Sequence, residues 1–210
     1  MTVLDLRPAG RTALLATFDS LPQVVAFRAG LTTATVPGLT EVVSGARTLL
    51  LRYDPATTDA ARLRGALERV VPSADADAAS ATDPLVIPVV YDGEDLDQVV
   101  ALTGMRRDRV IAWHTGQLWT SAFCGFAPGF SYLTGTEPSL DLPRRSTSRT
   151  AVPSGAVALA GEFSAVYPRV SPGGWQLIGR TDVPMWSLDR EPPALAPAGT
   201  RVRFVDAGAA

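Results

Sequence analysis

The chain of 210 residues contains no lysine, one histidine and one cysteine. Without lysine there is no phosphate-loop lysine, no Schiff-base amine and no lysine general base. The single His114 excludes a metal site with two or more histidines. Cys124 alone can form neither an internal disulfide nor a thiolate metal site. Chemistry in this chain must therefore use Asp, Glu, Arg, Tyr, Ser or Thr side chains, the one histidine or backbone groups.

Strong net charge and long apolar runs are also missing. The net charge of −2 at pH 7 predicts neither a nucleic-acid partner nor a membrane-surface partner. No apolar run approaches the length of a membrane helix. The first residues carry Asp5 and lack the apolar core of a secretory signal. With 46% hydrophobic residues, we expect a cytoplasmic globular protein that buries a sizeable core.

The first third of the chain alternates strand and helix patterns. Runs of β-branched and aliphatic residues predict strands over residues 11–18, 40–44 and 48–53. Helical periodicity predicts one helix after Ser20 and another over residues 59–71. The order β-α-β-β-α is the start of a ferredoxin-like split βαβ unit.

Local signals mark the start of the first helix and the buried side of the second. Ser20 and Gln23 have the spacing of a capping box, which predicts that the Ser20 side chain caps the first helix. In the second helix, apolar residues recur on one side. These residues are Leu63, Leu67, Val70 and Val71. Both helices are therefore expected to pack one face against the sheet.

Residues 72–84 (PSADADAASATDP) are small, polar and poor in apolar side chains. We interpret them as an interdomain linker; the alternative, a long surface loop within one domain, is less common at this length. The chain is thus expected to be an α+β protein with two domains. The ferredoxin-like domain covers residues 1–80, and the domain that carries the site covers residues 81–210.

The second domain begins with a buried strand over residues 85–91 and two short helices, the first ending at Gly104. From Gln117 onward, short strands alternate with Gly and Pro turns. That pattern favours a small β-barrel over a parallel sheet.

Residues 125–181 concentrate glycine, proline, aromatic and arginine residues. Glycine permits close backbone approach, proline fixes turns, and arginine presents a flat fork to carboxylates or phosphates. This composition is typical of a binding site built from loops on a β scaffold. The GFAPGF and Gly173-Gly174 turns could place backbone N–H groups near a ligand, but both are also common as barrel corners or hairpins.

Single side chains in or beside this block are site candidates with structural alternatives. His114 is the default proton carrier, yet a histidine at a helix end also caps carbonyl groups. Tyr132 and Tyr167 could donate to a ligand or lie in the core. A buried structural thiol is the better interpretation of Cys124. The arginines nearest the turns are Arg144, Arg145, Arg149 and Arg180, of which Arg180 is the best candidate for pairing with an anion.

Three strings together resemble one family: GFAPGFSYLTG from Gly125, LPRRSTSRTAVPSGAVALAG from Leu142 and YPRVSPGGWQLIGRT from Tyr167. The family is that of the 5-oxoprolinase B subunits, also named Kip-type kinase inhibitor, allophanate hydrolase subunit 1, or subdomains C and D of a carboxyltransferase domain. GRTALLATF, LLLRYDP, IPVVYDGEDL and the WHT at His114 match further landmarks. The resemblance therefore covers nearly the whole chain.

The resemblance implies a ferredoxin-like domain followed by a cyclophilin-like β-barrel. It also implies two partners, a second cyclophilin-like C subunit and an A subunit, in an ATP-dependent complex that opens the lactam of 5-oxoproline, a small amide substrate, to glutamate. ATP would bind to this chain or to a partner, and no metal site is implied. By similarity, the catalytic positions are His114, Tyr167 and Arg180. The substrate-binding positions are Phe126, Pro128, Gly129, Tyr132, Arg149, Gly173, Gly174 and Trp175.

The family names carry two alternatives. One is a regulatory protein that inhibits a sensor histidine kinase. The other is an allophanate or urea-type carboxyltransferase module that works with a biotin carrier. This chain cannot itself carry biotin, because it has no lysine.

The chain departs from the family pattern after AVALAG. Relatives commonly have Gly-Gln-Thr-Gly before the Tyr-Pro, whereas this chain has Glu162-Phe163-Ser164-Ala165. Phe163 removes an amide that could bind a ligand and adds bulk. The segment after Tyr91 is also shorter than in relatives. These changes affect the expected substrate more than the expected fold.

Overall fold

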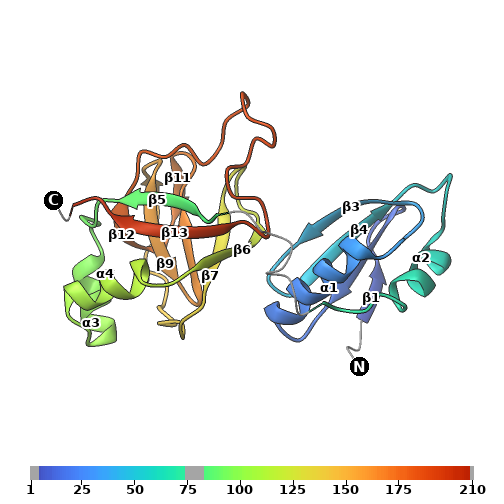
Figure 1. Ribbon diagram of the computed structural model, residues 1–210, viewed down its shortest axis with the longest axis horizontal. Coiled ribbons are helices and arrows are strands. Elements are labelled where there is room, and N and C mark those ends of the chain that lie inside the picture. Colours follow the sequence, from blue (N-terminus) through green and yellow to red (C-terminus); the bar gives the residue numbers. More distant parts are fainter. Residues whose placement is uncertain (1–4, 74–82, 209–210) are drawn as a thin grey trace. The chain divides into compact units, whose positions relative to one another are not determined.

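The computed structural model describes residues 5–73 and 83–208, and the chain divides into two compact units, Met1–Ala81 and Thr82–Ala210 (Figure 1). Most of the linker expected over residues 72–84 lies outside the described residues. Within the described part, no helix is long and apolar enough to cross a membrane.

The first unit is a mixed α/β unit. Its elements are β1 (Asp5–Pro8), β2 (Ala13–Thr17), α1 (Leu21–Thr33), β3 (Leu39–Ser44), β4 (Thr48–Tyr53) and α2 (Ala60–Leu67). Within residues 5–73, the strands form an antiparallel sheet in the order β1-β2-β4-β3. The expected β-α-β-β-α order is present from β2 to α2. The edge strand β1, which pairs with β2, was not expected.

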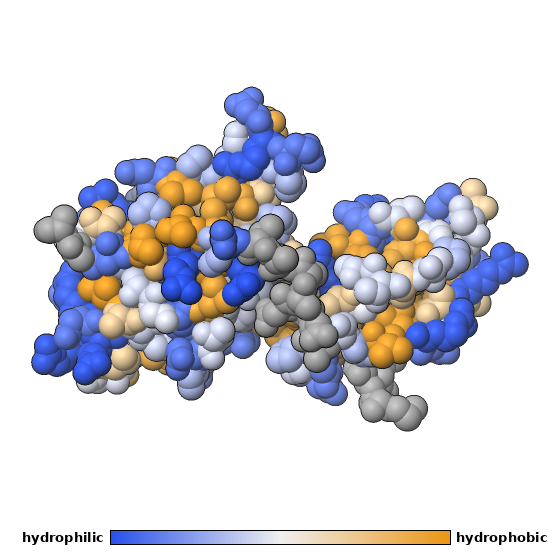
Figure 2. Space-filling view, viewed as in Figure 1, coloured by the Kyte–Doolittle hydropathy of each residue, from blue (hydrophilic) through white to orange (hydrophobic). Residues whose placement is uncertain are grey.

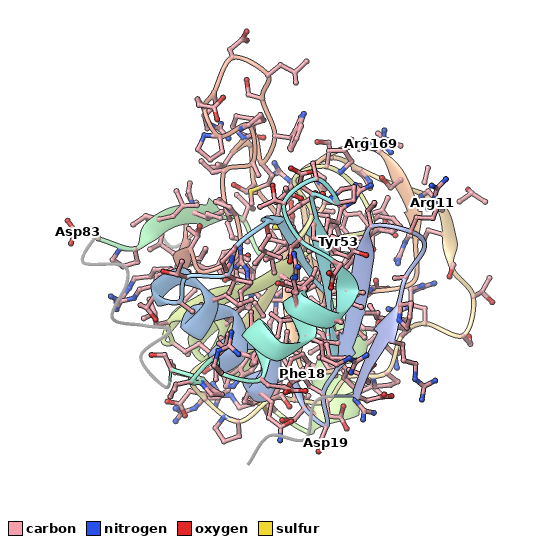
Figure 3. The ribbon with its side chains drawn as sticks, turned by 90° about the vertical axis from the view of Figure 1, so that its right-hand side faces the viewer. Arg11, Phe18, Asp19, Tyr53, Asp83 and Arg169 are labelled. Carbon is pink, nitrogen blue, oxygen red and sulfur yellow. The ribbon has the colours of Figure 1, made fainter. Side chains whose placement is uncertain are left out.

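The core of this unit lies between the sheet and the two helices. α1 contributes Val24 and Phe27, and α2 contributes Leu63 and Leu67, all at most 2% exposed. They pack with side chains of β2 and β4. Those side chains are Leu14, Ala16, Leu49 and Leu51. Phe18 and Tyr53 lie at opposite ends of the unit (Figure 3).

Two local expectations in this unit were wrong. The Ser20 side chain makes no capping bond among the described residues; instead, Asp19 N–H donates to Gln23 Oε1 at 3.1 Å, one residue earlier than a capping box requires. Val71 is 78% exposed, because α2 ends at Leu67 and its helical periodicity does not continue that far.

The second unit contains two helices and a larger set of strands. The first part comprises β5 (Leu85–Val89), α3 (Leu96–Thr103), α4 (Arg107–Thr115), β6 (Trp119–Cys124) and β7 (Ser131–Gly135). The second part comprises β8 (Arg149–Val152), β9 (Ala156–Ala160), β10 (Phe163–Val166), β11 (Ser171–Gly173), β12 (Gln176–Arg180) and β13 (Arg201–Asp206). Gly104 ends α3 in the left-handed conformation, as expected.

The strands of the second unit form a nearly closed, barrel-like sheet (Figure 1). Within residues 83–208 the strand order is β12-β9-β10-β7-β6-β13-β5, and β8 pairs with β11 in a separate ribbon. Only β13 and β5 pair in parallel in this described part. Val90, just after β5, exchanges two backbone hydrogen bonds of 2.9 Å with Arg180 of β12, which brings the two edges of the sheet together.

Glycine makes this edge-to-edge contact possible. A Cβ atom on Gly179 would lie 2.5 Å from the carbonyl oxygen of Val90. A Cβ on Gly93 would collide with the carbonyl oxygen of Leu177. A side chain at either position would force the two edges apart, so the closure depends on both glycines.

The two faces of the barrel sheet are packed differently. Along β9, Val157 and Leu159 belong to one hydrophobic cluster with β5, α3 and α4, whereas the alternating alanines belong to another. Those alanines are Ala156, Ala158 and Ala160. Figure 2 also shows apolar surface over β5 and β13, where Val86 is 52% exposed. The alanine side of β9 is the side on which the candidate site is built.

Candidate functional site

Aromatic rings cover the alanine side of β9. Phe130 contacts Tyr132, Tyr167 and Trp175, with ring centroids 5.1, 5.2 and 5.5 Å apart and inclined by 62–88°. Edge-to-face pairs of this kind add to the free energy gained by burial. The small alanines leave room for the rings against the strand. We call the set Phe126, Phe130, Tyr132, Phe163, Tyr167 and Trp175 the aromatic face.

The GFAPGF turn places an aromatic ring at the edge of this face. Phe126 has φ 67°, which is rare for a residue other than glycine, and is 59% exposed. Its ring lies 5.1 Å from that of Phe130. Gly129 has φ 81°, and a Cβ there would lie 2.8 Å from Cβ of Trp186, so the turn needs glycine. Pro128 is exposed within the same turn. An exposed ring on a strained backbone is a feature that binding sites often have.

The Gly173-Gly174 turn contributes in a different way from the one expected. A Cβ on Gly173 would collide with the Tyr167 hydroxyl. Glycine at this position therefore leaves the space that the hydroxyl occupies. Gly174 is buried, and its carbonyl accepts a 2.7 Å hydrogen bond from Arg145 N–H. The turn therefore positions Tyr167 and the Arg145 loop.

Both tyrosine hydroxyls of the aromatic face are neutral at physiological pH. Burial raises the pKa of Tyr132, and the nearby charge of Arg144 only partly opposes this. Burial also raises the pKa of Tyr167, opposed by a backbone hydrogen bond from Trp175 and by Arg144. The two hydroxyls are therefore hydrogen-bond donors near a guanidinium, not general bases.

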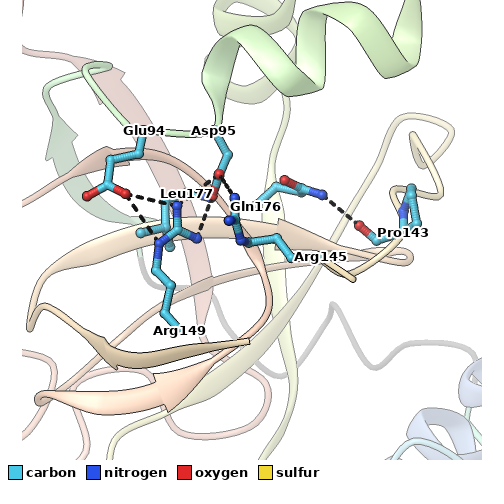
Figure 4. A network of polar contacts seen from close by, with 7 residues as sticks. All are labelled: Glu94, Asp95, Pro143, Arg145, Arg149, Gln176 and Leu177. Atoms are coloured by element: carbon cyan, nitrogen blue, oxygen red, sulfur yellow. Dashed lines mark hydrogen bonds and ion pairs between the residues drawn. The ribbon is translucent and has the colours of Figure 1, made fainter. Parts of the chain in front are cut away.

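A charged network joins Asp95 and Glu94 to two arginines (Figure 4). It borders the aromatic face through Leu177, which belongs to the same cluster as Tyr167 and Trp175. Asp95, whose side chain is 3% exposed, accepts hydrogen bonds of 2.8 and 2.9 Å from Arg149 and 2.8 Å from Leu177 N–H. Arg145 forms an ion pair with the same carboxylate. Arg149 also bonds Glu94 at 3.0 Å. We call Glu94, Asp95, Arg145 and Arg149 the Asp95 network.

Asp95 remains ionised in this buried position. Burial raises its pKa, but hydrogen bonds from Arg149 and Leu177 and the charges of Arg149 and Arg145 lower it further, so the net pKa is below the ordinary value. The same bonds raise the pKa of Arg149. The network joins the start of α3 to β8, β12 and the loop before β8. It holds Arg145 and Arg149 in place at the edge of the aromatic face.

His114 lies in another part of the barrel unit. It is fully buried, and its ring nitrogens bond Tyr91 Oη at 2.7 Å and Ser164 Oγ at 2.9 Å. Its ring stacks on Phe204 at 4.3 Å. Burial lowers the pKa of His114 to about 3, so the imidazole is neutral. We call Tyr91, His114 and Ser164 the histidine cluster.

Arg180 also lies apart from the aromatic face. It is exposed where the two edges of the sheet meet, and its side chain bonds Asp92 at 2.9 Å. The structure thus brings most of the expected site residues together and leaves two elsewhere. The residues in or beside the aromatic face are Phe126, Pro128, Gly129, Tyr132, Arg149, Tyr167, Gly173, Gly174 and Trp175. The residues elsewhere are His114 and Arg180.

The segment that departs from the family pattern contributes to both faces of the sheet. Phe163 packs on Tyr132 at 5.5 Å in the aromatic face, while Ser164 points the other way and bonds His114. Phe163 therefore fills part of the aromatic face. The hydroxyl of Ser164 has a structural partner.

Sequence reasoning missed the acidic half of the site. Asp95 precedes an apolar helical pattern, which marks a helix start and says nothing of arginines 50 and 54 residues away. Gln176 carries no sequence signal beyond its place in a strand.

No residue in the described ranges belongs to a group of three metal-ligating side chains. Cys124 is half-buried, with its Sγ 3.6 Å from Ser131 Oγ and the Ala196 carbonyl, in keeping with a structural thiol.

The family model described as "Carboxyltransferase domain, subdomain C and D" matches residues 4–196. The chain therefore belongs to this family. It is 41% identical over 125 residues to the 5-oxoprolinase B subunit of Haemophilus influenzae, a match that covers 58% of this chain and 59% of the relative. It is 41% identical over 122 residues to the 5-oxoprolinase B subunit of Bacillus subtilis, covering 57% and 51%. The chain thus spans a little over half the length of these relatives.

Solved structures share the fold. The crystal structure of TTHA0988 superposes with a TM-score of 0.76 at 35% identity, covering 95% of this chain and 40% of that one. The uncharacterised protein PH0987 from Pyrococcus horikoshii gives a TM-score of 0.57 at 31% identity, covering 96% of each chain. The urea carboxylase of Kluyveromyces lactis gives 0.68 at 18% identity, covering 98% of this chain and 22% of that one. The last likeness concerns the fold alone.

Proposed function

We propose that this chain is the B subunit of an ATP-dependent 5-oxoprolinase-type complex that hydrolyses the lactam of 5-oxoproline to glutamate. The observation that carries the proposal is the 41% identity to two proteins named as B subunits of 5-oxoprolinase. The chain acts with an A and a C subunit and is inactive alone. ATP binds to this chain or to a partner. In this proposal the first unit has a ferredoxin-like fold, in which β1 takes the place of the fourth strand. The second unit is a cyclophilin-like barrel.

The chemistry suits the side chains of the aromatic face. A lactam is a poor electrophile, and transfer of the ATP γ-phosphoryl group to its carbonyl oxygen, with release of ADP, would make it a better one. Attack by water would then break the ring C–N bond and release phosphate. The neutral hydroxyls of Tyr132 and Tyr167 can donate to that oxygen, and Arg144 can stabilise negative charge on it. The rings of Phe130 and Trp175 offer a flat apolar surface to a five-membered ring.

His114 has no proton-transfer role in this proposal, because its ring is sealed in the core and neutral. Arg149 acts in this proposal through its ion pair with Asp95, which holds the charged side chains of the Asp95 network in place. The likeness to urea carboxylase supports the fold and no second function, because the identity is only 18%.

The test is co-expression of the chain with its A and C partners, followed by an assay of glutamate formed from 5-oxoproline with and without ATP. We expect ATP-dependent turnover by the complex. Tyr167→Phe keeps the ring and should lower kcat/KM by about tenfold or more, the effect of losing one transition-state donor. Tyr53→Phe in the first unit is the matched control and should leave kcat/KM unchanged. A stable complex without turnover would point to a different amide substrate.

The variant Arg180→Ala tests the catalytic position that the sequence analysis assigned to Arg180. Abolished activity in a folded complex would place Arg180 in the site despite its distance from the aromatic face. Full activity would limit its role to the sheet edge and its bond to Asp92.

A further inference from the structure

Residues 184–195, between β12 and β13, form a hairpin that projects from the barrel unit (Figure 1). Its arms are joined by a bridge between Trp186 and Ala194, and Leu195 N–H donates to the Met185 carbonyl at 2.9 Å. Met185 is 2% exposed and anchors the base of the hairpin in the core. Hydrogen bonds and a buried anchor therefore fix how the hairpin leaves the barrel.

The side chain of Arg190 braces the tip of this hairpin. Its guanidinium donates to the carbonyl groups of Pro193 at 3.4 Å and Pro184 at 3.1 Å. Both carbonyl groups belong to the hairpin itself, so the brace favours one shape of the tip. A segment that already has its bound shape loses less conformational entropy when it binds than a loose loop does.

The braced tip holds a large apolar side chain out in solvent. Leu188 is 83% exposed, and Trp186, two residues earlier, is 38% exposed. A single exposed apolar residue needs no explanation on its own. Here two of them lie on a shaped projection, and the same unit has an apolar pocket of a size that suits one of them.

This pocket, of about 390 Å³, opens at the foot of the hairpin, where the two edges of the sheet meet. Its apolar walls are Pro88, Val90, Val183, Pro184 and Ala207. Three of these, Pro88, Pro184 and Ala207, are exposed, so the pocket can be reached from solvent. Figure 2 shows apolar surface over β5 and around the foot of the hairpin. Cavities of about 300–1,000 Å³ hold small molecules, so a leucine side chain fits this one.

The hairpin does not fill the pocket with its own tip. Pro184 lines the pocket, whereas Leu188 lies four residues further along a braced arm, at most about 14 Å away, and is exposed. A second copy related by a twofold axis can place its hairpin antiparallel to the first, so that each tip reaches the other pocket. An added peptide strand fits less well, because Pro88 has no N–H and interrupts the ladder that such a strand needs.

The charges of the tip and of the neighbouring strand β13 are complementary. Asp189 and Glu191 are exposed at the tip, and neither forms an ion pair with a described residue. Arg190, the basic residue between them, bonds the carbonyl groups of its own hairpin. On β13, Arg201 and Arg203 also lack a carboxylate partner among the described residues.

The other charges near the pocket decide which way the tip faces. Arg180 is paired with Asp92 at 2.9 Å, and Asp182 lies on the wall formed by the residues after β12. Arg203 lies on the other side, next to Val86 of β5, and both side chains are exposed. An acidic tip is therefore attracted toward β13 and repelled by Asp182.

We propose that this chain forms a twofold-symmetric dimer in which Leu188 of each copy enters the pocket at the foot of the other copy's hairpin. Asp189 and Glu191 of each tip then lie toward Arg201 and Arg203 of the other copy. Because both copies use the same two surfaces, the contact closes on itself and does not build longer chains. The dimer involves the second unit alone and does not rest on the proposed function.

Sedimentation equilibrium of the full chain over a series of concentrations tests the proposal. We expect a monomer–dimer equilibrium, and Leu188→Ser should raise its Kd about a hundredfold. Each dimer loses two buried leucine side chains, and each is worth about tenfold or more. Since Leu188 is 83% exposed, the variant should fold as the unaltered chain does. Leu102→Ser, at a 44% exposed leucine of α3, is the matched control and should leave Kd unchanged.

Filling the receiving pocket tests the other half of the contact. Ala207 is exposed, so Ala207→Phe is compatible with the fold and places a ring where Leu188 would enter. It should raise Kd about as much as Leu188→Ser does. The two changes together should add little to either one, because both remove the same contact.

A charge exchange tests the orientation of the tip. Glu191→Arg and Arg203→Glu should each raise Kd about threefold or more, a modest effect because ion pairs at an exposed rim contribute little. The double variant restores opposite charges in reversed positions, so its Kd should return toward that of the unaltered chain.

A chain that stays monomeric at every concentration would overturn the proposal, as would a dimer that neither Leu188→Ser nor Ala207→Phe weakens. If the chain is monomeric and Leu188→Ser instead abolishes binding of an A or C subunit, the tip belongs to that partner and the dimer is wrong. Turnover of 5-oxoproline is a separate measurement. Its absence would remove the proposed function and leave the dimer in place.

Discussion

The barrel unit buries two titratable groups and keeps them in opposite charge states. In the histidine cluster, His114 meets neutral hydroxyls of Tyr91 and Ser164 and an aromatic ring, and its imidazole stays neutral. In the Asp95 network, the carboxylate meets two guanidiniums and a backbone N–H, and it stays charged. Both side chains are at most 3% exposed.

The difference shows that burial alone does not decide the charge of a group. Burial disfavours the charged form in both places. At His114 nothing compensates the lost hydration, so the neutral form is favoured. At Asp95 the hydrogen bonds and charges of the arginines exceed the cost of burial. The histidine cluster can therefore act as a rigid neutral support, and the Asp95 network holds Arg145 and Arg149 in place beside the aromatic face.

The largest effect is expected when the charge of Asp95 is removed. Asp95→Asn keeps the shape but leaves Arg145 and Arg149 without their shared anion, and should lower the free energy of unfolding of the second unit by about 3–5 kcal/mol. All four tryptophans lie between residues 113 and 186, so urea unfolding followed by tryptophan fluorescence reports on this unit. Asp97→Asn is the control: its side chain is 89% exposed, and the change should cost less than about 1 kcal/mol. Equal effects of the two variants would contradict the description of Asp95 as a buried, paired charge.

The two groups should also destabilise the unit in different pH ranges. The folded pKa of His114 is about 3, below the ordinary value of about 6.5. The unfolded chain therefore binds the extra proton first, and stability should fall as the pH falls from about 6.5, by at most about 1.4 kcal/mol per pH unit. The folded pKa of Asp95 is also lowered, so its stabilisation is present above about pH 4 and is lost only below it.

Urea unfolding at a series of pH values checks this separation. In His114→Gln, the slope between pH 6.5 and 4.5 should largely disappear, while the loss of stability below about pH 4 remains. An unchanged slope in this variant would show that His114 is not the group that titrates.

The smallest effect is expected at Ser164. Ser164→Ala removes the partner of His114 Nε2 and should cost about 1–2 kcal/mol, since a buried polar atom is left unpaired. The same change in a His114→Phe background should cost less, because no ring nitrogen then needs the hydroxyl. The four proteins to compare are the unaltered chain, the two single variants and the double variant. Their urea unfolding, followed by tryptophan fluorescence, gives the coupling free energy between Ser164 and His114. Strictly additive effects would mean that the serine and the histidine do not support each other.

Much of the local structure could be predicted from sequence, because it depends on neighbouring residues. Gly104 ends α3 through its own left-handed conformation, and the alternating strands β3 and β4 follow from runs of suitable residues. The capping box at Ser20 was wrong because the Gln23 side chain accepts from Asp19 N–H, one residue before Ser20, and the Ser20 side chain makes no capping bond among the described residues. The sequence pointed to the GFAPGF and Gly173-Gly174 turns as parts of one candidate site, and both turns lie at the aromatic face. The acidic partners of its arginines, Glu94 and Asp95, were missed because ion pairs across 50 and 54 residues leave no local pattern.

By itself, the sequence determined the available chemistry: one histidine, one cysteine and no lysine, with arginines and aromatics gathered between residues 125 and 181. Only the tertiary structure decided which of these groups lie in the core and which lie on the aromatic face. Closing the sheet placed His114 inside the barrel unit and Tyr132, Tyr167 and Trp175 on the aromatic face. The physical reason is that the surroundings of a side chain depend on the strands and helices packed against it, and these come from segments far away in the chain.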